Sequence, residues 1–425
     1  MNLTQNLLKG KKIVVCVTGS IAIYKAIELV RLFVKADAEV RVIMSQSAKK
    51  FISALTFETI SQNRVLDDTN ESWADDYNHI KIAEWADIFV IAPATANTIA
   101  KFANAIADNI LLQSVLAFSG KKILAPAANT NMLHNPISQA NLKMLAIANY
   151  EIVDTQTKEL ACQRVGDGAM ADVEDIFYLT ARELLKDPFW DNRMVIVTGG
   201  GTVEKIDDVR YISNYSSGKM GSAMATALYL KGADVNLIAT RFGENLSSMI
   251  HTIEVESSDE MYRYLVDSIR VAKKGKLSKA TLIGDDEIKL IQKTPYLFMS
   301  AAVSDYVPEF VQSKKLKKDV LGEKWALSLK QNRDILQSLD KDGIVTVGFK
   351  AEMDESCAFE NAKNMLEKKE LDAVCLNVLK DSSSFGTSTN SIEFINKHNS
   401  VKLPEDDKLK LSLEILELAK ELSDE

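Results

Sequence analysis

The chain has 425 residues, of which 46% are hydrophobic, and this is enough apolar material for two globular cores. Its formal net charge of −8 argues against nucleic acid or an anionic membrane surface as its main partner. The first ten residues lack the apolar core of a signal peptide, and no later apolar run approaches the roughly 20 residues of a spanning helix, so a cytoplasmic protein is expected.

Short apolar segments alternate with amphipathic ones in the first half of the chain. A strand is expected at 12–18, followed by a turn and an amphipathic helix with Ile23, Ala26 and Val30 on its inner face. Further strands are expected at 39–44, 87–92 and 122–125, and further helices at 107–118 and 138–149. This alternation predicts a flavodoxin-like, doubly wound parallel sheet.

The segment 186–192 interrupts this pattern, and a new strand, glycine turn and helix begin at Arg193. We therefore expect a boundary here, between a first domain of residues 1–190 and a second domain of residues 191–425. The second half repeats the alternation, with strands expected at 194–198, 234–239, 296–300, 345–348 and 373–376 and a last helix at 406–422. This pattern predicts a second, Rossmann-like α/β domain.

Two turns at the ends of expected strands predict an anion site in the first domain. Gly19-Ser20-Ile21 follows the strand at 12–18, where free amides and the Ser20 hydroxyl can hold a phosphate at the carboxyl edge of the sheet. Ala92-Pro93-Ala94-Thr95-Ala96-Asn97 follows the buried strand at 87–92. Together the two segments resemble the flavin-dependent cysteine decarboxylase family, in which an A-P-x-T-A-N segment lines the FMN.

The resemblance implies FMN as the cofactor of the first domain. The implied cofactor-binding residues are Gly19, Ser20, Ile21, Ser45, Pro93, Ala94, Thr95 and Asn97. In that family, FMN oxidises the cysteine moiety of phosphopantothenoylcysteine to a thioaldehyde, which loses carbon dioxide because the sulfur accepts the electrons left behind. Reduced flavin then returns a hydride to the ene-thiol, and an acid supplies a proton.

Two polar residues match catalytic positions of this family. His79 precedes Trp85-Ala86-Asp87 as in the pattern H-I-x-L-x-x-W-A-D, with Ile82 in place of leucine, and an imidazole suits a group that polarises or deprotonates the substrate thiol. Asn129 matches the asparagine that holds the substrate carboxylate in a P-x-M-N motif, although Ala128 replaces the methionine. The alternative for His79 is a surface histidine at the start of a helix, and the alternative for Asn129 is an asparagine that only forms a turn.

Cys162 is one of four scattered cysteines, and none of them has the C-x-x-C spacing of a zinc or redox site. Its surroundings resemble the family's A-C-G-x-x-G-x-G-R-M lid, with Gln163 in place of glycine and Ala169 in place of arginine. A free thiol, with a pKa of about 8.5, is mostly protonated at neutral pH. The resemblance therefore implies that Cys162 donates a proton to the ene-thiolate, and the alternative is an idle surface thiol.

The second domain begins with a glycine-rich turn that also predicts an anion site. Gly199-Gly200-Gly201 follows the strand at 194–198, which lets the backbone approach a ligand closely. Ser216 and Ser217 are expected to cap a helix that begins near Gly218, and the free amides of this helix would face the ligand. The turn is not a Walker A loop, because Met220 stands where that motif needs serine or threonine.

The string V-R-Y-I-S-N-x-S-S-G-K-M-G at 209–221 follows a G-x-T-x-E-x-x-D turn and resembles the phosphopantothenate-cysteine ligase half of the bacterial bifunctional coenzyme A biosynthesis family. Two departures are Gly201 in place of proline and Val203 at a position that is often basic. The resemblance implies that CTP, with Mg²⁺, activates the carboxylate of 4′-phosphopantothenate as an acyl-cytidylate, which the amine of cysteine attacks. It implies Asn214 as the residue that stabilises this intermediate. The implied substrate-binding residues are Arg210, Ser216, Ser217, Gly218 and Lys219.

Four later segments resemble the nucleotide-binding motifs A-A-V-A-D-Y, K-I-K-K, N-P-D-I and G-F-A-A-E of the same family. The implied nucleotide-binding residues are Ala301, Ala302, Val303, Asp305, Lys317, Asn332, Arg333, Asp334, Ile335, Phe349 and Lys369. Arg333 replaces the proline, and Met365 occupies the first of two lysine positions on the next helix, where Lys363 could substitute. The pattern does not identify the ligands of a metal ion.

The resemblance extends over residues 11–395, and its two halves connect because the product of the ligase is the substrate of the decarboxylase. We therefore expect an enzyme that ligates 4′-phosphopantothenate to cysteine and converts the product to 4′-phosphopantetheine. The family also implies a homo-oligomer, a dodecamer of decarboxylase trimers and ligase dimers, with flavin sites between protomers. Two alternatives are a flavin-binding regulatory protein and an enzyme in which only the ligase is active.

One stretch departs from the family. Residues 271–293 are rich in charge and form a longer segment than the resemblance leads us to expect. We interpret them as a solvated excursion from the second domain, with the binding of a partner as the alternative.

Overall fold

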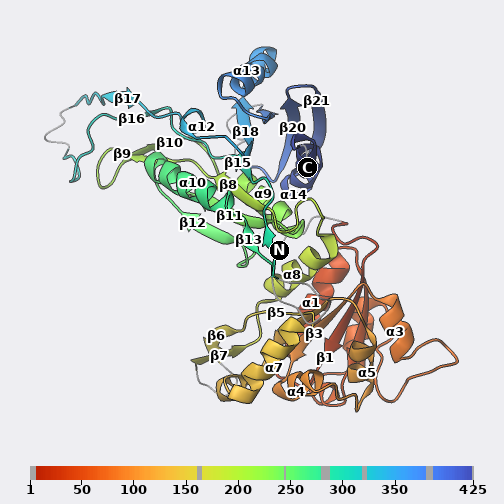
Figure 1. Ribbon diagram of the computed structural model, residues 1–425. Coiled ribbons are helices and arrows are strands. Elements are labelled where there is room, and N and C mark those ends of the chain that lie inside the picture. The colour runs from red at the N-terminus through yellow and green to blue at the C-terminus, as the bar shows by residue number, and fades with distance from the viewer. Residues whose placement is uncertain are drawn as a thin grey trace. The chain divides into compact units, whose positions relative to one another are not determined.

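A computed structural model describes residues 6–159, 165–243, 246–278, 288–317, 323–379 and 386–423 (Figure 1). The chain divides into two compact units. Unit 1 comprises Met1–Leu185 and Ser278–Lys289, and unit 2 comprises Lys186–Leu277 and Leu290–Glu425. Among the described residues, no helix combines the length and the apolar character needed to cross a membrane.

Unit 1 is built on a five-stranded, fully parallel sheet with the strand order β2-β1-β3-β4-β5. The strands are β1 (Lys12–Val17), β2 (Glu39–Met44), β3 (Ile88–Ala94), β4 (Lys122–Pro126) and β5 (Tyr150–Ile152). The helices are α1 (Ile23–Lys35), α2 (Ala54–Ser61), α3 (His79–Trp85), α4 (Ala96–Ala103), α5 (Ile110–Ala117), α6 (Thr130–Leu133), α7 (Pro136–Ile147) and α8 (Val173–Leu185), with a 3₁₀ turn η1 (Ala48–Lys50). This strand order is the flavodoxin-like arrangement, so the predicted fold of the first half is confirmed.

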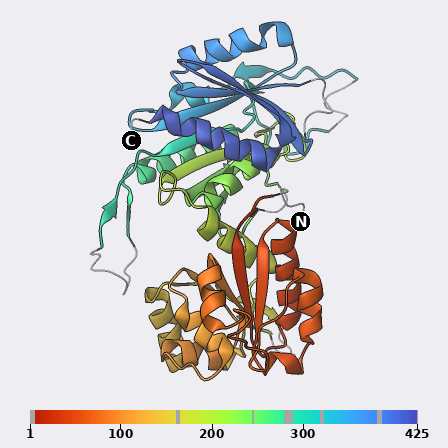
Figure 2. The same cartoon turned by 90° about the vertical axis from the view of Figure 1, so that its right-hand side faces the viewer.

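Helices cover both faces of this sheet, as Figure 2 shows. Val14, Cys16, Phe89 and Leu124 are fully buried between the strands and these helices. Strands that are covered on both faces carry continuous apolar runs, and this is why the four predicted strands lie within two residues of the observed ones. A hairpin of β6 (Gln156–Glu159) and β7 (Val165–Ala169) follows the sheet and was not predicted.

Unit 2 contains an eight-stranded sheet with the order β12-β11-β8-β15-β18-β19-β20-β21. The strands are β8 (Met194–Gly199), β11 (Asp234–Ala239), β12 (His251–Glu254), β15 (Tyr296–Met299), β18 (Val345–Glu352), β19 (Ala373–Val378), β20 (Thr389–Asn396) and β21 (Ser400–Asp407). The six strands from β12 to β19 are parallel; five of them were predicted, and β12 was not. Strands β20 and β21 add an antiparallel edge that was also not predicted. The last helix therefore begins at Lys408 and not at residue 406, because the chain up to Asp407 belongs to β21.

Helices and short ribbons complete unit 2. The helices are α9 (Lys219–Leu230), α10 (Ser258–Ala272), α12 (Ile335–Ser338), α13 (Glu355–Lys368) and α14 (Lys408–Ala419), with a 3₁₀ turn η3 (Lys420–Leu422). The ribbons pair β9 (Val203–Lys205) with β10 (Tyr211–Ser213), β16 (Tyr306–Pro308) with β17 (Leu329–Gln331), and β13 (Lys276–Leu277) with β14 (Leu290–Ile291). Helices α10, α12 and α13 share one apolar core with the sheet, while α9 and α14 pack against each other outside that core.

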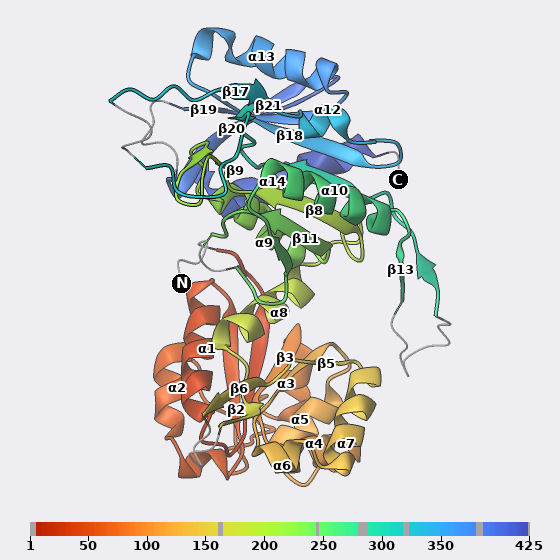
Figure 3. The ribbon, with the colours of Figure 1, turned by 90° about the vertical axis from the view of Figure 1, so that its left-hand side faces the viewer.

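The charged stretch 271–293 leaves the sheet of unit 2 as the separate ribbon of β13 and β14, which Figure 3 shows. Lys276 at the base of this ribbon is paired with Asp234 at the start of β11. Residues 279–287 of this stretch lie outside the described residues.

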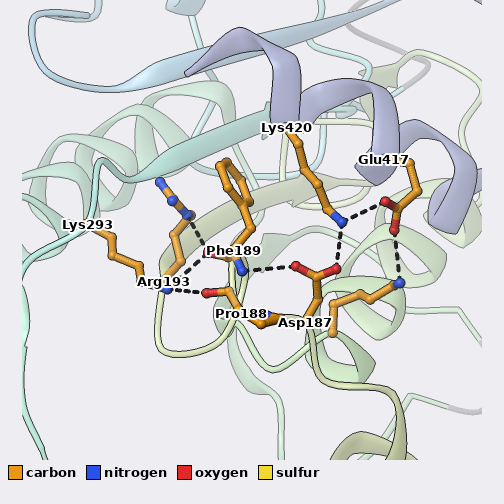
Figure 4. Close-up of polar contacts among 8 residues, drawn as sticks. Asp187, Pro188, Phe189, Arg193, Lys293, Glu417 and Lys420 are labelled. Atoms are coloured by element: carbon orange, nitrogen blue, oxygen red, sulfur yellow. Dashed lines mark hydrogen bonds and ion pairs between the residues drawn. The ribbon is translucent and has the colours of Figure 1, made fainter. Parts of the chain in front are cut away.

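The segment 186–193 is held within unit 2 by a cluster of charged groups (Figure 4). Arg193 is only 1% exposed; its guanidinium lies 4.0 Å from the centre of the Phe189 ring, and it donates hydrogen bonds to the carbonyls of Phe189 and Thr294 at 3.1 and 2.6 Å. The Lys420 ammonium donates to the Asp187 carboxylate at 2.6 Å. Burial raises the pKa of Asp187, but hydrogen bonds from Lys420 and the Phe189 amide outweigh it, so the net pKa is below its ordinary value.

Candidate functional sites

A pocket of about 710 Å³ lies where β1, β2 and β3 of unit 1 end, and we call it the unit 1 pocket. It is lined by Thr18, Gly19, Ser20, Ser45, Gln46, Ser47, Asp68, Thr95, Ala96, Asn97, Thr98, Lys101, Asp108, Asn109, Leu111, Leu112, Ala127, Ala128 and Met132. The carboxyl edge of a parallel sheet is the usual ligand site of a doubly wound fold. The predicted cofactor residues Gly19, Ser20, Ser45, Thr95 and Asn97 are therefore brought together here from three separate loops.

Close backbone packing shapes this pocket. A Cβ atom on Gly19 would lie 2.5 Å from the Cβ atom of Ser47, so only glycine fits where the first two loops meet. The Thr18 hydroxyl donates to the Pro93 carbonyl at 2.6 Å and accepts from the Thr95 amide at 3.2 Å, which ties the loop after β1 to the end of β3. The part of the pocket wall formed by these loops thus carries the small hydroxyl side chains of Ser20, Ser45 and Thr95, which are groups that can hold phosphate.

Three predicted cofactor residues do not line the unit 1 pocket. Pro93 and Ala94 are buried in β3, and the Ile21 side chain is 59% exposed. The pocket instead includes Lys101 and Asp108, which form an ion pair at 2.5 Å, and neither was predicted. The sequence did carry a signal for the start of α5, because Asn109 is a favourable helix-capping residue and precedes an apolar run. In the structure it caps α5 by accepting from the Leu112 amide.

His79 is the first residue of α3 and is not among the residues that line the unit 1 pocket. Its Nδ1 atom lies 2.7 Å from Oε1 of Glu71, and the Trp73 ring meets the imidazole edge to face at 5.7 Å. Glu71 was not predicted, because it precedes the histidine by eight residues in a segment without a periodic pattern. A carboxylate at Nδ1 orients an imidazole so that Nε2 faces away from it.

Asn129 caps α6, where its side chain accepts a hydrogen bond from the Asn131 amide, and its neighbour Ala128 lines the unit 1 pocket. The β6–β7 hairpin passes close to this point, since the Ala128 amide donates to the Gly168 carbonyl at 3.1 Å. His134 and Asp167 form a further ion pair between α6 and β7. The predicted proton donor Cys162 and its neighbour Gln163 lie outside the described residues.

A smaller pocket of about 130 Å³ lies in unit 2, and we call it the unit 2 pocket. It is lined by Gly200, Tyr215, Ser216, Ser217, Gly218, Lys219, Met220, Gly221, Ser300, Ala302, Phe349, Lys350, Ala351, Cys375, Asn377, Leu379, Gly386, Asn390, Ile392 and Lys408. The predicted substrate residues Ser216 to Lys219 thus meet the predicted nucleotide residues Ala302 and Phe349.

The loop before α9 differs from the prediction that its serines cap the helix. The capping residue is Gly218, with a left-handed φ of 73°, and no side chain caps the helix; Ser217 Oγ accepts from the Lys219 amide only at 3.5 Å. A Cβ atom on Gly218 would lie 2.1 Å from the Arg241 carbonyl oxygen, so the close approach of the loop after β11 requires glycine. The serine side chains are left to line the pocket.

Two predicted residues of this loop do not line the unit 2 pocket. Asn214 is exposed, and its side-chain amide donates to the Val303 carbonyl at 3.0 Å, which joins two motif loops. Arg210 donates to the Asp207 carboxylate at 2.5 Å and to the Leu316 carbonyl at 3.2 Å. Burial raises the pKa of Asp207, but backbone hydrogen bonds from Val209, Leu316 and Arg210 outweigh this effect and bring the pKa to about 2.

The remaining predicted nucleotide residues form a second group beside Ala302. The Asn332 amide donates to the Asp305 carbonyl at 2.7 Å, while its side chain donates to the Ser304 carbonyl at 2.8 Å. Asp334 caps α12 and pairs with Lys369 at 2.9 Å. The other members are placed as follows: Arg333 lies over the Tyr262 ring, Ile335 is buried, Ala301 and Val303 pack against the core, and Lys317 is exposed beside residues 318–322, which are not described.

Met365, at the first lysine position of the family pattern, packs against the apolar core, so it offers no charge. The Lys363 ammonium lies 4.8 Å from the centre of the Phe359 ring. In the described part of the chain, no group of three or more His, Cys, Asp or Glu side chains is arranged to hold a metal ion.

Comparison with known proteins divides the chain close to the boundary between units 1 and 2, which lies after Leu185. The "Flavoprotein" family model matches residues 1–185, and the model for the "DNA/pantothenate metabolism flavoprotein C-terminal domain" matches residues 190–276 and 276–422. The second match is interrupted at residue 276, inside the charged stretch 271–293.

Curated relatives match over almost the whole chain. The coenzyme A biosynthesis bifunctional protein of Borreliella burgdorferi is 33% identical over 416 residues, covering 96% of this chain and 99% of the relative. That of Haemophilus influenzae is 35% identical over 413 residues, covering 96% and 97%. Among solved structures, a PPC decarboxylase mutant complexed with pantothenoylaminoethenethiol is 29% identical and covers 40% of this chain and 96% of its own, with a TM-score of 0.37. The C-terminal domain of a coenzyme A biosynthesis bifunctional protein is 25% identical and covers 55% and 96%, with a TM-score of 0.42.

Proposed function

We infer the chemistry of this chain from its family, because the chain belongs to the coenzyme A biosynthesis bifunctional proteins and has a flavoprotein decarboxylase half and a ligase half. We propose that unit 2 ligates 4′-phosphopantothenate to cysteine with CTP, and that unit 1 decarboxylates the product to 4′-phosphopantetheine. The observation that carries the proposal is the convergence of motif residues from distant loops on one pocket in each unit.

In the ligase reaction, CTP gives the carboxylate of 4′-phosphopantothenate a cytidylate leaving group, and the cysteine amine then displaces it. Ser216, Ser217, Lys219 and Phe349 line the unit 2 pocket, and we propose that the two hydroxyls and the ammonium bind anionic groups there. Asn214 is proposed to donate a hydrogen bond where charge accumulates on the acyl-cytidylate. Magnesium would neutralise the triphosphate, held mainly by the nucleotide itself.

The residues of the unit 1 pocket fit FMN. Its volume suits a cofactor of this size, and Gly19, Ser20 and Ser45 would hold the phosphate through amides and hydroxyls, while Thr95 and Asn97 would also contact the cofactor. When bound, FMN supplies the two-electron oxidation that makes the cysteine carboxylate labile and later returns the hydride. His79 is proposed to take the thiol proton, Asn129 to hold the substrate carboxylate, and Cys162 to donate the final proton.

We propose that the active form is a homo-oligomer in which a second protomer completes the flavin site. The support is that His79 does not line the pocket formed by its own chain, although its Nδ1 atom is fixed by Glu71. The expected assembly is a dodecamer of decarboxylase trimers and ligase dimers. Sedimentation of the purified protein as a monomer would contradict this part alone.

The decisive experiment supplies 4′-phosphopantothenate, cysteine, CTP and Mg²⁺ and follows pyrophosphate and carbon dioxide together. We expect both products to form at equal rates once the intermediate has reached its steady state. Pyrophosphate without carbon dioxide would mean that only the ligase is active, and a flavin-containing protein that releases neither would support the regulatory alternative. A protein that cannot be reconstituted with FMN would reject the decarboxylase assignment.

A further inference from the structure

The lining of the unit 2 pocket is strongly biased in charge. The described residues that line it include three lysines, Lys219, Lys350 and Lys408, and no aspartate or glutamate, although the whole chain has a net charge of −8. Lys350 is partly neutralised by Glu352, whose carboxylate lies 3.2 Å from its ammonium. The excess positive charge of the pocket therefore comes from Lys219 and Lys408.

Lys408 is held in an unusual position for a lysine. It is the first residue of α14 and only 8% exposed, and its ammonium donates to the carbonyls of Thr387 and Thr389 at 2.5 and 3.1 Å and to Oδ1 of Asn390 at 3.4 Å. None of these acceptors carries a full negative charge, and within the described residues Lys408 forms no ion pair with a carboxylate. By contrast, Lys410 in the same helix pairs with Asp406. A buried cation without a counter-charge is costly, so an anion near it would be stabilising.

Lys219 lines the same pocket and resembles Lys408 in its place on a helix. It is the first residue of α9, and its ammonium donates to the Gly386 carbonyl at 2.7 Å. Helices α9 and α14 pack against each other, so the positive ends of two helix dipoles lie at the same pocket as the two ammonium groups. Burial, and secondarily the positive charge of Lys219, lowers the pKa of Lys408 to about 8.

We propose that Lys408 and Lys219 together bind a phosphate group of a ligase substrate, so that Lys408 is a binding residue of the ligase site. The proposal rests on the ligase function proposed above. The pocket, at about 130 Å³, is smaller than the usual site for a whole ligand and suits one end of a longer molecule. A lysine has three donors, and a phosphate oxygen would replace the longest of its present bonds, the one to Asn390.

Two substrates carry suitable groups, the triphosphate of CTP and the phosphomonoester of 4′-phosphopantothenate. The test measures, by calorimetry on the full-length protein, the affinities for CTP with Mg²⁺, for 4′-phosphopantothenate and for inorganic tripolyphosphate. Lys408→Met removes the charge and keeps the length of the chain, and Lys410→Met is the matched control on the same helix. We expect Lys408→Met to weaken binding at least about tenfold, which is the weight of one charge-assisted hydrogen bond, and Lys410→Met to have no effect.

The outcomes separate the sources of the phosphate. Loss of affinity for CTP and tripolyphosphate assigns the pocket to the triphosphate, and loss for 4′-phosphopantothenate alone assigns it to the phosphomonoester. Unchanged affinity for all three ligands would overturn the proposal. Lys408→Arg, which keeps the charge, should retain most of the affinity, and an equal loss in the Arg and Met variants would mean that packing and not charge is responsible. If the parent binds neither substrate, the ligase function itself fails, and tripolyphosphate binding still decides whether the pocket is an anion site.

Discussion

Replacing Arg193 by methionine should destabilise unit 2 by about 3 kcal/mol without affecting unit 1. The guanidinium is buried and stacks on the Phe189 ring, and it donates to the carbonyl of Phe189 (Figure 4) and to that of Thr294. Each carbonyl left without its donor costs about 1 to 3 kcal/mol, and the lost cation–π contact costs roughly 1 to 2 kcal/mol more. Methionine recovers part of this sum, because it removes the cost of burying a charge.

The assay is urea unfolding of the full-length protein followed by two probes. Trp190 and Trp325 belong to unit 2, whereas Trp73 and Trp85 belong to unit 1 and are replaced by phenylalanine in the parent and in every variant, so that tryptophan fluorescence reports on unit 2. Flavin fluorescence reports on unit 1 once FMN is bound. With a slope of about 3 kcal/mol per molar urea for a domain of this size, the midpoint of unit 2 should fall by about 1 M. The midpoint reported by the flavin should stay where it is.

Arg263 provides a matched control. Its guanidinium pairs with Asp259 one turn away on α10, and its side chain is 68% exposed, so Arg263→Met should change the stability by less than about 0.5 kcal/mol. Arg193→Lys keeps the charge but not the planar fork that reaches two carbonyls, and it should lose most of the same free energy. A shift in Arg193→Met no larger than that of the Arg263 control would refute the reasoning, and so would an equal shift in both probes.

Three further predictions concern the two sites and one buried lysine. Asn214→Ala should slow pyrophosphate release by roughly 30- to 1000-fold, the effect of removing about 2 to 4 kcal/mol of transition-state stabilisation, while carbon dioxide release from supplied phosphopantothenoylcysteine should persist; equal loss of both activities would point to folding or assembly. Cys162→Ser should still oxidise and decarboxylate the substrate but accumulate an oxidised ene-thiol product, because a serine hydroxyl is a far weaker acid than a thiol, and normal 4′-phosphopantetheine at the parent rate would exclude Cys162 as the proton donor. Burial lowers the pKa of Lys122 to about 8, below its unfolded value, so the unfolded state binds more protons between these values and stability rises as the pH increases through them. Lys122→Met should therefore stabilise unit 1 by about 1 kcal/mol at pH 7 and by less at pH 10, and thermal unfolding at the two pH values measures the difference.

The sequence by itself determined the elements whose signals are local. Buried parallel strands carry continuous apolar runs, and glycines mark the turns at their carboxyl ends, so β1, β2, β8 and β11 could be located within a residue or two. The same turns identified the loops around Ser20 and Lys219, because an anion site at such an edge needs small residues and free amides near one another in the chain. Both fold classes followed from the alternation of these elements.

Only the tertiary structure decided which distant groups share a site. Lys408 meets Lys219 in the unit 2 pocket although 189 residues separate them, and neither the pattern of α14 nor its charges distinguish Lys408 from Lys410. Glu71 contacts His79, although the segment between them has no periodic pattern. Asp187 pairs with Lys420, although the two residues stand near opposite ends of the sequence of unit 2.

The physical reason is that charge and burial belong to an environment and not to a residue type. A strand signal depends on side chains a few positions apart, whose spacing the backbone sets directly. The ionisation and the partners of a lysine depend on everything that surrounds it, and this is assembled only when β19, β20 and the first turns of α9 and α14 come together. The antiparallel edge formed by β20 and β21 carried no strong sequence signal, yet it brings Asn390 and Lys408 to the unit 2 pocket.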